Sequence, residues 1–257
     1  MSLVFAGHIP NDPHFVADIA TQPLPKDQSP IASALSEIEG ELYFMKPETV
    51  IFLTEHQVII PDIVNMQVVP QVEHELFKGS VIKTDALFTS ELKGTTEVQQ
   101  HTIPLTIIAE PRIDDVIAAP IALMMRHIAS SAKIVVLALP SMSAHALTSF
   151  GDFLKREIMR TERRVALFST GRLCATHEKN ITSAQTVSRI ITKSIEEKNY
   201  SSIASIQHSL AIESLCDSIA PLSVLFSSLS DVNISAEIFA QGEEHGATHM
   251  VMNCILQ

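Results

Sequence analysis

Tryptophan is missing from this 257-residue sequence, and tyrosine and cysteine are scarce, with two and three residues respectively. So few aromatic rings argue against a sugar-binding surface or an aromatic cage, because both depend on exposed rings. The three cysteines are odd in number and far apart, and no CxxC pair is present. This pattern argues against a disulfide framework and against a cysteine zinc site, so we expect reduced, buried thiols and a cytoplasmic protein.

Long hydrophobic runs are also missing from the sequence, and basic residues are fewer than acidic ones. No stretch approaches the roughly 18 apolar residues of a membrane-spanning helix. The first residues, MSLVFAGHIPND, lack the basic region and apolar core of a signal peptide. Eighteen basic residues stand against 29 acidic ones, for a formal charge of −11, so we do not expect nucleic acid as a partner. The glycine-rich and nucleophile motifs of nucleotide-binding proteins and serine hydrolases are absent from the sequence.

Apolar residues make up 46% of the sequence, which is enough to bury a sizeable core. Apolar runs of strand length alternate with longer helical patterns, which indicates strand–helix–strand units. We predict one α/β domain over residues 1–257, with a mixed, largely parallel central sheet, helices on both faces and a closing antiparallel hairpin. The predicted strands are 3–6, 49–53, 102–109, 133–139 and 164–168, the predicted helices are 30–45, 115–129, 144–160, 183–198 and 208–229, and the hairpin lies within 236–256.

Two histidines follow predicted strands at the edge where parallel sheets bind ligands. His8 follows the first strand and His56 follows the second. The carboxyl ends of nearby parallel strands lie roughly 5–10 Å apart, so the two rings can share a metal ion if both are neutral. Because the chain contains 11 histidines, simple polar capping of the strand ends is the alternative interpretation.

The residues around both histidines resemble the class III extradiol ring-cleavage dioxygenases, which include the catalytic subunit of protocatechuate 4,5-dioxygenase and the Memo-like proteins. The family's strand that runs into a Ser-His-Ile-Pro or Pro-His-Pro-Pro turn is matched by Gly7-His8-Ile9-Pro10. Its Lys-Pro-Asp-like turn into a strand that ends in His is matched by Lys46-Pro47-Glu48 and then Thr54-Glu55-His56. Weaker similarity extends to about residue 230.

This resemblance implies a ferrous ion held by two His and one carboxylate, an arrangement that leaves positions for a catecholate and O₂. His8 and His56 would be the imidazole ligands. Glu213 would be the carboxylate ligand, and Asp217, four residues further along the same predicted helix, is the alternative. Fe²⁺ is the expected cofactor, while Zn²⁺, Mn²⁺ and loss of the metal stay open.

Two departures from the family pattern concern residues that would handle the substrate. Asp115 stands where the family has a substrate-contacting His, and Asp115 and Pro10 are the residues expected on the substrate side. An ionised carboxylate at that place would repel an anionic catecholate. Cys174-Ala175 occupies the place of the family's Ser-His pair, so His177, two residues later, becomes the candidate proton-transfer group.

The leading hypothesis is a non-haem Fe²⁺ extradiol dioxygenase that opens the ring of a small aromatic diol with O₂. One alternative is a catalytically altered or inactive Memo-like member whose metal pocket binds a partner or ligand. A second alternative is a metal-dependent hydrolase, because Asp115 beside two His and a Glu would form a harder, more charged site. Relatives are often oligomeric, so the resemblance also implies a homo-oligomer.

Overall fold

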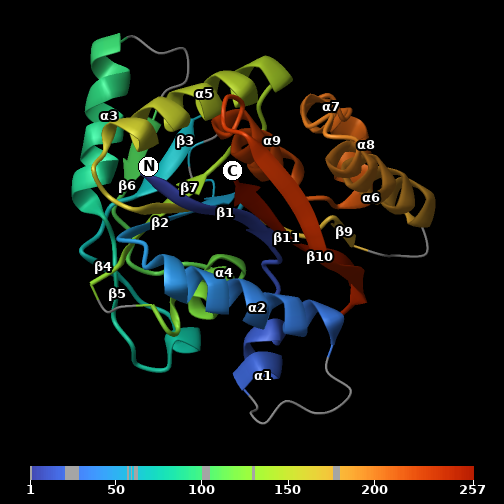
Figure 1. Cartoon of the computed structure of the whole chain (residues 1–257), viewed down its shortest axis with the longest axis horizontal. Coiled ribbons are helices and arrows are strands. Elements are labelled where there is room, and N and C mark those ends of the chain that lie inside the picture. Colours follow the sequence, from blue (N-terminus) through green and yellow to red (C-terminus); the bar gives the residue numbers. More distant parts are fainter. Residues whose placement is uncertain are drawn as a thin grey trace.

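A nine-stranded mixed sheet runs through the protein, and helices cover both of its faces (Figure 1). The computed structural model describes residues 2–20, 29–56, 58, 60, 63–99, 105–128, 131–175 and 180–257. The strand order is β10-β11-β1-β8-β2-β7-β3-β6, and β9 pairs with β11 beside this path. The predicted fold, one α/β domain with a mixed, largely parallel sheet, is confirmed.

The central strands β1, β8, β2 and β7 are parallel neighbours, whereas β11 and β10 add an antiparallel hairpin next to β1. The strands are β1 (Leu3–Ile9), β2 (Thr49–Thr54), β3 (Val64–Gln67), β4 (Gln71–Val72), β5 (Ile82–Lys83), β6 (Leu105–Ile108), β7 (Lys133–Ala138), β8 (Val165–Thr170), β9 (Cys174–Ala175), β10 (Ile234–Glu244) and β11 (Ala247–Leu256). The helices are α1 (His14–Ala20), α2 (Pro30–Met45), the 3-10 turn η1 (Glu75–Phe77), α3 (Ala86–Gln99), α4 (Asp115–Met125), α5 (Ala144–Arg160), α6 (Ile181–Glu196), α7 (Ser201–Ala204), α8 (His208–Ser214) and α9 (Ile219–Ser228).

The central strands consist of β-branched and apolar residues because both of their faces are covered. Every residue of β2 and β8 is buried. Alternate residues of β2 point to opposite sides: Ile51 and Leu53 belong to the core that includes α5 and α9, while Val50 and Phe52 belong to the core that includes α2 and α4. The carboxyl ends of these strands are therefore held rigidly between two packed layers.

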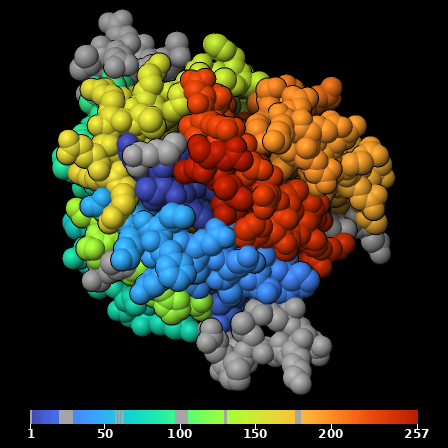
Figure 2. Space-filling view, viewed as in Figure 1, coloured from blue at the N-terminus to red at the C-terminus, as the bar shows by residue number. Residues whose placement is uncertain are grey.

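The ends of the chain lie together on one face of the molecule. β1 is hydrogen-bonded to β11, and α2 packs over the C-terminal hairpin, where Asn253 Nδ2 donates to Glu41 Oε2 at 2.5 Å. Figure 2 shows α2 and the hairpin side by side on this face. None of the helices in the described part of the chain has the length and apolar character needed to cross a membrane. The three cysteines are free and buried, as predicted.

Helix starts follow the capping residues in the sequence. Ser29 accepts a hydrogen bond from Ala32 N at 3.1 Å and precedes Pro30 at the first helical position of α2. Ser143 accepts from Ala146 N at 3.2 Å and starts α5. The predicted ranges 30–45 and 144–160 are confirmed in full. The predicted strand 102–109 is observed as β6, although residues 102–104 lie outside the described residues.

The largest difference from the sequence prediction is a break in the helix predicted over 208–229. α8 ends at Ser214 because Leu215 takes a left-handed conformation with φ of 53°. The chain then turns toward the loop after β8, where Asp217 N and Ser218 Oγ both donate to the carbonyl of Arg172, at 3.4 and 2.7 Å. The expectation that Glu213 and Asp217 share one helical face was therefore wrong.

The contact between α5 and α9 depends on a glycine. A Cβ on Gly151 would lie 2.4 Å from Ser227 Cβ and 2.9 Å from the carbonyl oxygen of Val224. We expect Gly151→Ala to lower the free energy of unfolding by about 1–3 kcal/mol, the usual cost of overpacking. Gly40→Ala in α2 is the matched control, because its Cβ would meet nothing within 4 Å and should stabilise the helix by about 0.5–1 kcal/mol. Urea unfolding measures both, and equal effects would contradict the account.

Candidate functional site

The strand order of the sheet brings His8 and His56 to the same side of the molecule, at the carboxyl ends of the central parallel strands. His8 lies inside β1, one residue before its end and opposite Ser169 of β8, so the expectation that it follows the strand was wrong. β2, which precedes His56, pairs with the other side of β8. The two histidines thus stand two strands apart, which corresponds to roughly 10 Å between strand axes. This agrees with the spacing that the sequence predicts for them.

His8 is completely buried in the sheet. Its Nδ1 lies 2.9 Å from Ser169 Oγ, whereas its Nε2 has no hydrogen-bond partner. Burial lowers the pKa of His8 to about 4, even though the nearby charge of Asp217 acts in the opposite direction. The ring is therefore neutral near pH 7, and its buried Nε2 is available to a ligand.

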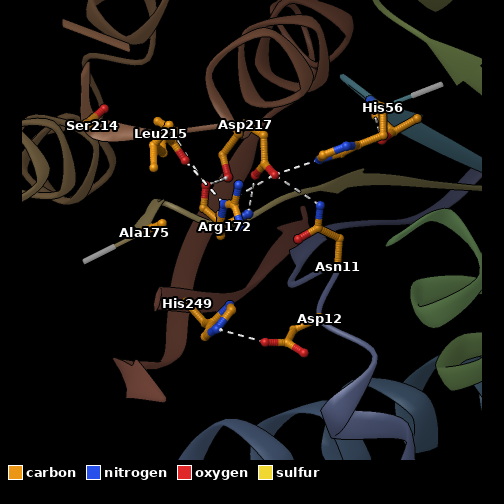
Figure 3. A network of polar contacts seen from close by, with 12 residues as sticks. Asn11, Asp12, His56, Arg172, Ala175, Ser214, Leu215, Asp217 and His249 are labelled. Carbon is orange, nitrogen blue, oxygen red and sulfur yellow. Dashed lines mark hydrogen bonds and ion pairs between the residues drawn. The ribbon is translucent and has the colours of Figure 1, made fainter. Parts of the chain in front are cut away.

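Asp217 forms the centre of the polar network drawn in Figure 3. Its Oδ2 lies 2.7 Å from His56 Nε2 and accepts from Asn11 Nδ2 at 3.2 Å. Its Oδ1 accepts from the backbone N–H of Arg172, whose Nε lies 3.6 Å from Oδ2. Burial lowers the pKa of His56, but the hydrogen bond and charge of Asp217 outweigh it, so the pKa of His56 is raised.

Gly171 allows the 216–218 turn to approach the end of β8. A Cβ on Gly171 would lie 2.7 Å from the carbonyl oxygen of Asp217 and 2.8 Å from both Asp217 Oδ1 and Ser218 Oγ. A side chain at this position would therefore displace the carboxylate from its partners. The glycine after β8 is thus part of what positions Asp217.

A cavity of about 530 Å³ opens beside the network, with Glu55, Arg172 and Asp217 at its polar end. Glu55 accepts from Ala220 N at 3.0 Å, in the first turn of α9. Burial raises the pKa of Glu55 to about 7 against the opposite effect of this hydrogen bond. The rest of the cavity is mainly apolar, and its lining includes Val58, Leu139, Pro140, Met142, Leu147, Ile206, Ala211, Ile212, Leu215 and Ile219.

His249 reaches the same edge from β11, where it is 1% exposed. Its Nε2 lies 3.2 Å from the carbonyl oxygen of Glu244 and 3.7 Å from Asp12 Oδ2, while its Nδ1 is buried without a partner. Burial lowers the pKa of His249. Figure 3 shows His249 and Asp12 facing each other next to the Asp217 network.

The other predicted site residues lie in different surroundings. Glu213 is exposed on α8, and its place beside His56 is taken by Asp217, because the helix break turns the chain inward after Leu215. The Asp115 side chain is 68% exposed at the start of α4, and its Oδ1 lies 2.9 Å from His74 Nε2 rather than in the network. Pro10 is buried between His8 and Asn11, and His177 lies outside the described residues.

Within the described ranges, no three His, Cys, Asp or Glu side chains are already arranged around one metal position. His8 Nε2 is open, but His56 Nε2 and Asp217 Oδ2 contact each other. A metal ion at this edge would replace that contact. No pattern in the sequence predicts a role for Asn11 or Arg172 in this site, and His249 was expected only as a residue within the hairpin of 236–256.

Comparison with known proteins supports the fold without identifying a family. No protein-family model matches the sequence, and no curated protein sequence matches it. The solved structure of an uncharacterized protein from Escherichia coli K12 is similar, with a TM-score of 0.65 and 12% sequence identity. The match covers 98% of this chain and 99% of that chain. At this identity the likeness shows a shared fold and nothing about activity.

The two site histidines should titrate in opposite ways in metal-free protein. His8 should stay neutral until the pH falls toward 4, whereas His56 should titrate above its ordinary value of about 6.5. Two-dimensional NMR of the imidazole nitrogens measures both pKa values, and the variants His8→Gln and His56→Gln assign the two sets of signals. Titration of His8 near 6.5 would contradict the buried, partnerless ring.

The same shifts set the pH dependence of stability. Between pH 6.5 and 4 the unfolded chain protonates His8 and the folded chain does not, so stability falls as the pH decreases through this window, by roughly 3 kcal/mol in total. His56 acts oppositely: its contribution is present below 6.5 and is lost as the pH rises through its raised pKa.

Proposed function

We propose that the protein is a metal-dependent oxygenase of the extradiol type, which holds Fe²⁺ through His8, His56 and Asp217 and opens a catechol-type ring with O₂. The observation that carries this proposal is the buried Nε2 of His8, which has no partner in the described structure. Leaving such an atom unsatisfied costs roughly 1–3 kcal/mol, and a bound metal would remove that cost.

The donor set fits a ferrous ion in its chemistry. Two imidazoles and one carboxylate are the ligands of the facial triad of non-haem Fe²⁺ oxygenases. His8 is neutral and therefore able to ligate, and Asp217 is oriented by Asn11 Nδ2 and by the N–H of Arg172. Such supporting hydrogen bonds fix the direction of a ligating group.

The cavity beside Asp217 supports an aromatic diol as the substrate. When bound, Fe²⁺ would supply the open positions at which a diol and O₂ meet. The apolar walls would receive the ring and its substituents and exclude water from it. Glu55, with a pKa of about 7, is protonated in part of the molecules and can donate a hydrogen bond to a substrate oxygen at the polar end.

A catalytically altered or inactive Memo-like member is the second candidate function, and the His56–Asp217 contact favours a form of it that has lost the metal. This contact at 2.7 Å satisfies both side chains without a metal, as a purely structural pair would. The hydrolase hypothesis has less support, because it depended on Asp115 beside the histidines, and Asp115 is paired with His74 at the start of α4.

Iron content and turnover distinguish these functions. Anaerobically iron-loaded protein should bind about one Fe²⁺ per chain and form coloured ring-opening products from catechols in air. Asp217→Asn should weaken Fe²⁺ binding at least about 100-fold, beyond the 10–100-fold expected for removing an outer partner. Glu213→Gln is the matched control, because Glu213 is exposed on α8, and it should leave both binding and turnover unchanged.

Two other outcomes would overturn the proposal in different ways. Stoichiometric iron without turnover of any catechol would reject the dioxygenase and leave the altered metal pocket. Loss of iron in Glu213→Gln but not in Asp217→Asn would reject the proposed ligand set.

A further inference from the structure

Three consecutive large apolar residues at the C-terminal end of α2 are exposed to solvent. Phe44 is 78% exposed, Tyr43 52% and Met45 46%. Exposed apolar side chains grouped in this way usually mark a surface that meets another molecule. α2 leads directly into the start of β2, so this surface lies at the amino ends of the central strands, away from the Asp217 network.

A cavity of about 500 Å³ lies directly beside these rings. Its lining includes Ser36, Gly40 and Phe44 of α2 and Arg126 at the end of α4. The Arg126 guanidinium is held by the buried carboxylate of Glu39, to which its Nε donates at 3.0 Å. A guanidinium fixed in this way can stack on an aromatic ring. The cavity therefore combines small residues with a cation that suits an aromatic side chain.

The exposed rings and the cavity lie on one helix with a spacing that suits a two-fold axis. If two identical helices pair antiparallel about an axis at Gly40, the residue four places after Gly40 faces the residue four places before it. Phe44 of one copy then lies over Ser36 of the other, in the cavity, and the reciprocal contact is identical. A Cβ on Gly40 would meet nothing within 4 Å, and α2 lies uncovered across the face shown in Figure 2. Two copies can therefore approach closely at Gly40.

The charges along α2 also suit an antiparallel copy. Burial raises the pKa of Glu41, and the like charge of Glu37 raises it further, so negative charge is crowded on this helix. The same two-fold axis places Tyr43 of the other copy opposite Glu37 and Lys46, the last residue of the helix cap, within one turn of it. The second copy would therefore supply a hydroxyl donor and a cation to an acidic surface.

We propose that α2 is the interface of a homodimer, in which two copies of this chain pair antiparallel about Gly40 and each inserts Phe44 into the cavity of the other. α2 has 16 residues, so the contact is about 24 Å long. A contact centred on one helix of this length is at the small end of specific interfaces, so we expect a dissociation constant in the micromolar range. This dimer does not depend on the proposed metal site or its chemistry.

Sedimentation velocity of the full-length protein at roughly 1–100 µM, a range around a micromolar dissociation constant, measures the association. Phe44→Glu should raise the dissociation constant at least about 30-fold, the effect of losing a central hot-spot residue. Gly40→Arg should have a similar effect because it places two like charges on the axis, while nothing in a single copy obstructs the new side chain. Leu87→Glu is the matched control, because Leu87 is 57% exposed on α3, and it should leave the dimer intact.

Cross-linking tests the position of the axis. Gly40→Cys would face its own copy and should give a disulfide-linked dimer under mild oxidation, because the three native cysteines are buried and do not compete. Ser33→Cys is the control on the same helix. Antiparallel pairing about Gly40 separates the two copies of residue 33 by about 21 Å along the helices, which is beyond the reach of a disulfide.

Three results would overturn the proposal, once urea unfolding has shown that each variant is folded. The first is a monomeric wild type across the whole concentration range, even if the exposed rings bind a different protein. The second is a dimer that neither Phe44→Glu nor Gly40→Arg weakens, because the interface would then lie elsewhere. The third is a cross-link in Ser33→Cys but not in Gly40→Cys, which would contradict the antiparallel pairing about Gly40.

Discussion

The carboxylate of Asp217 joins chain segments that are far apart in the sequence, and the candidate site depends on it. It contacts His56 after β2, Asn11 after β1 and the backbone of Arg172 after β8. These segments meet because β1, β8 and β2 are parallel neighbours whose carboxyl ends share one edge. The approach is possible only because Gly171 has no side chain to block the turn that carries Asp217.

The packed layers on both faces of the sheet make this edge rigid, so polar groups placed there cannot relax toward water. His8 Nε2 and His249 Nδ1 are two of the three side-chain atoms that are buried without a partner among the described residues, and the third is Tyr200 Oη. Unsatisfied groups of this kind are expected where a structure is arranged for a ligand rather than for stability alone. The two imidazole nitrogens lie at the carboxyl ends of the central strands, so a single ligand site can explain why each lacks a partner.

The sequence predicts the architecture well because hydrophobic runs and capping residues are local signals. Strands β2, β7 and β8, helices α2 and α5 and the final hairpin all follow from such signals. The carboxylate beside His56 was harder to predict because it depends on the break after α8. This break comes from Leu215 in a left-handed conformation, a position where a glycine would have marked the end of the helix. Pro221 was the available signal: proline belongs in the first turn of a helix, so it marks α9 as a new helix. His249, Asn11 and Arg172 join the site only through strand pairing that no local pattern encodes.

We propose that one metal ion binds where His8, His56 and Asp217 converge. Anomalous diffraction at the iron edge, from anaerobic crystals of iron-loaded protein, tests it most directly. We expect one strong peak about 2.0–2.2 Å from His8 Nε2, His56 Nε2 and a carboxylate oxygen of Asp217, with the His56–Asp217 hydrogen bond replaced by bonds to the metal. A peak held by other residues, or no peak at this edge in fully loaded protein, would contradict it.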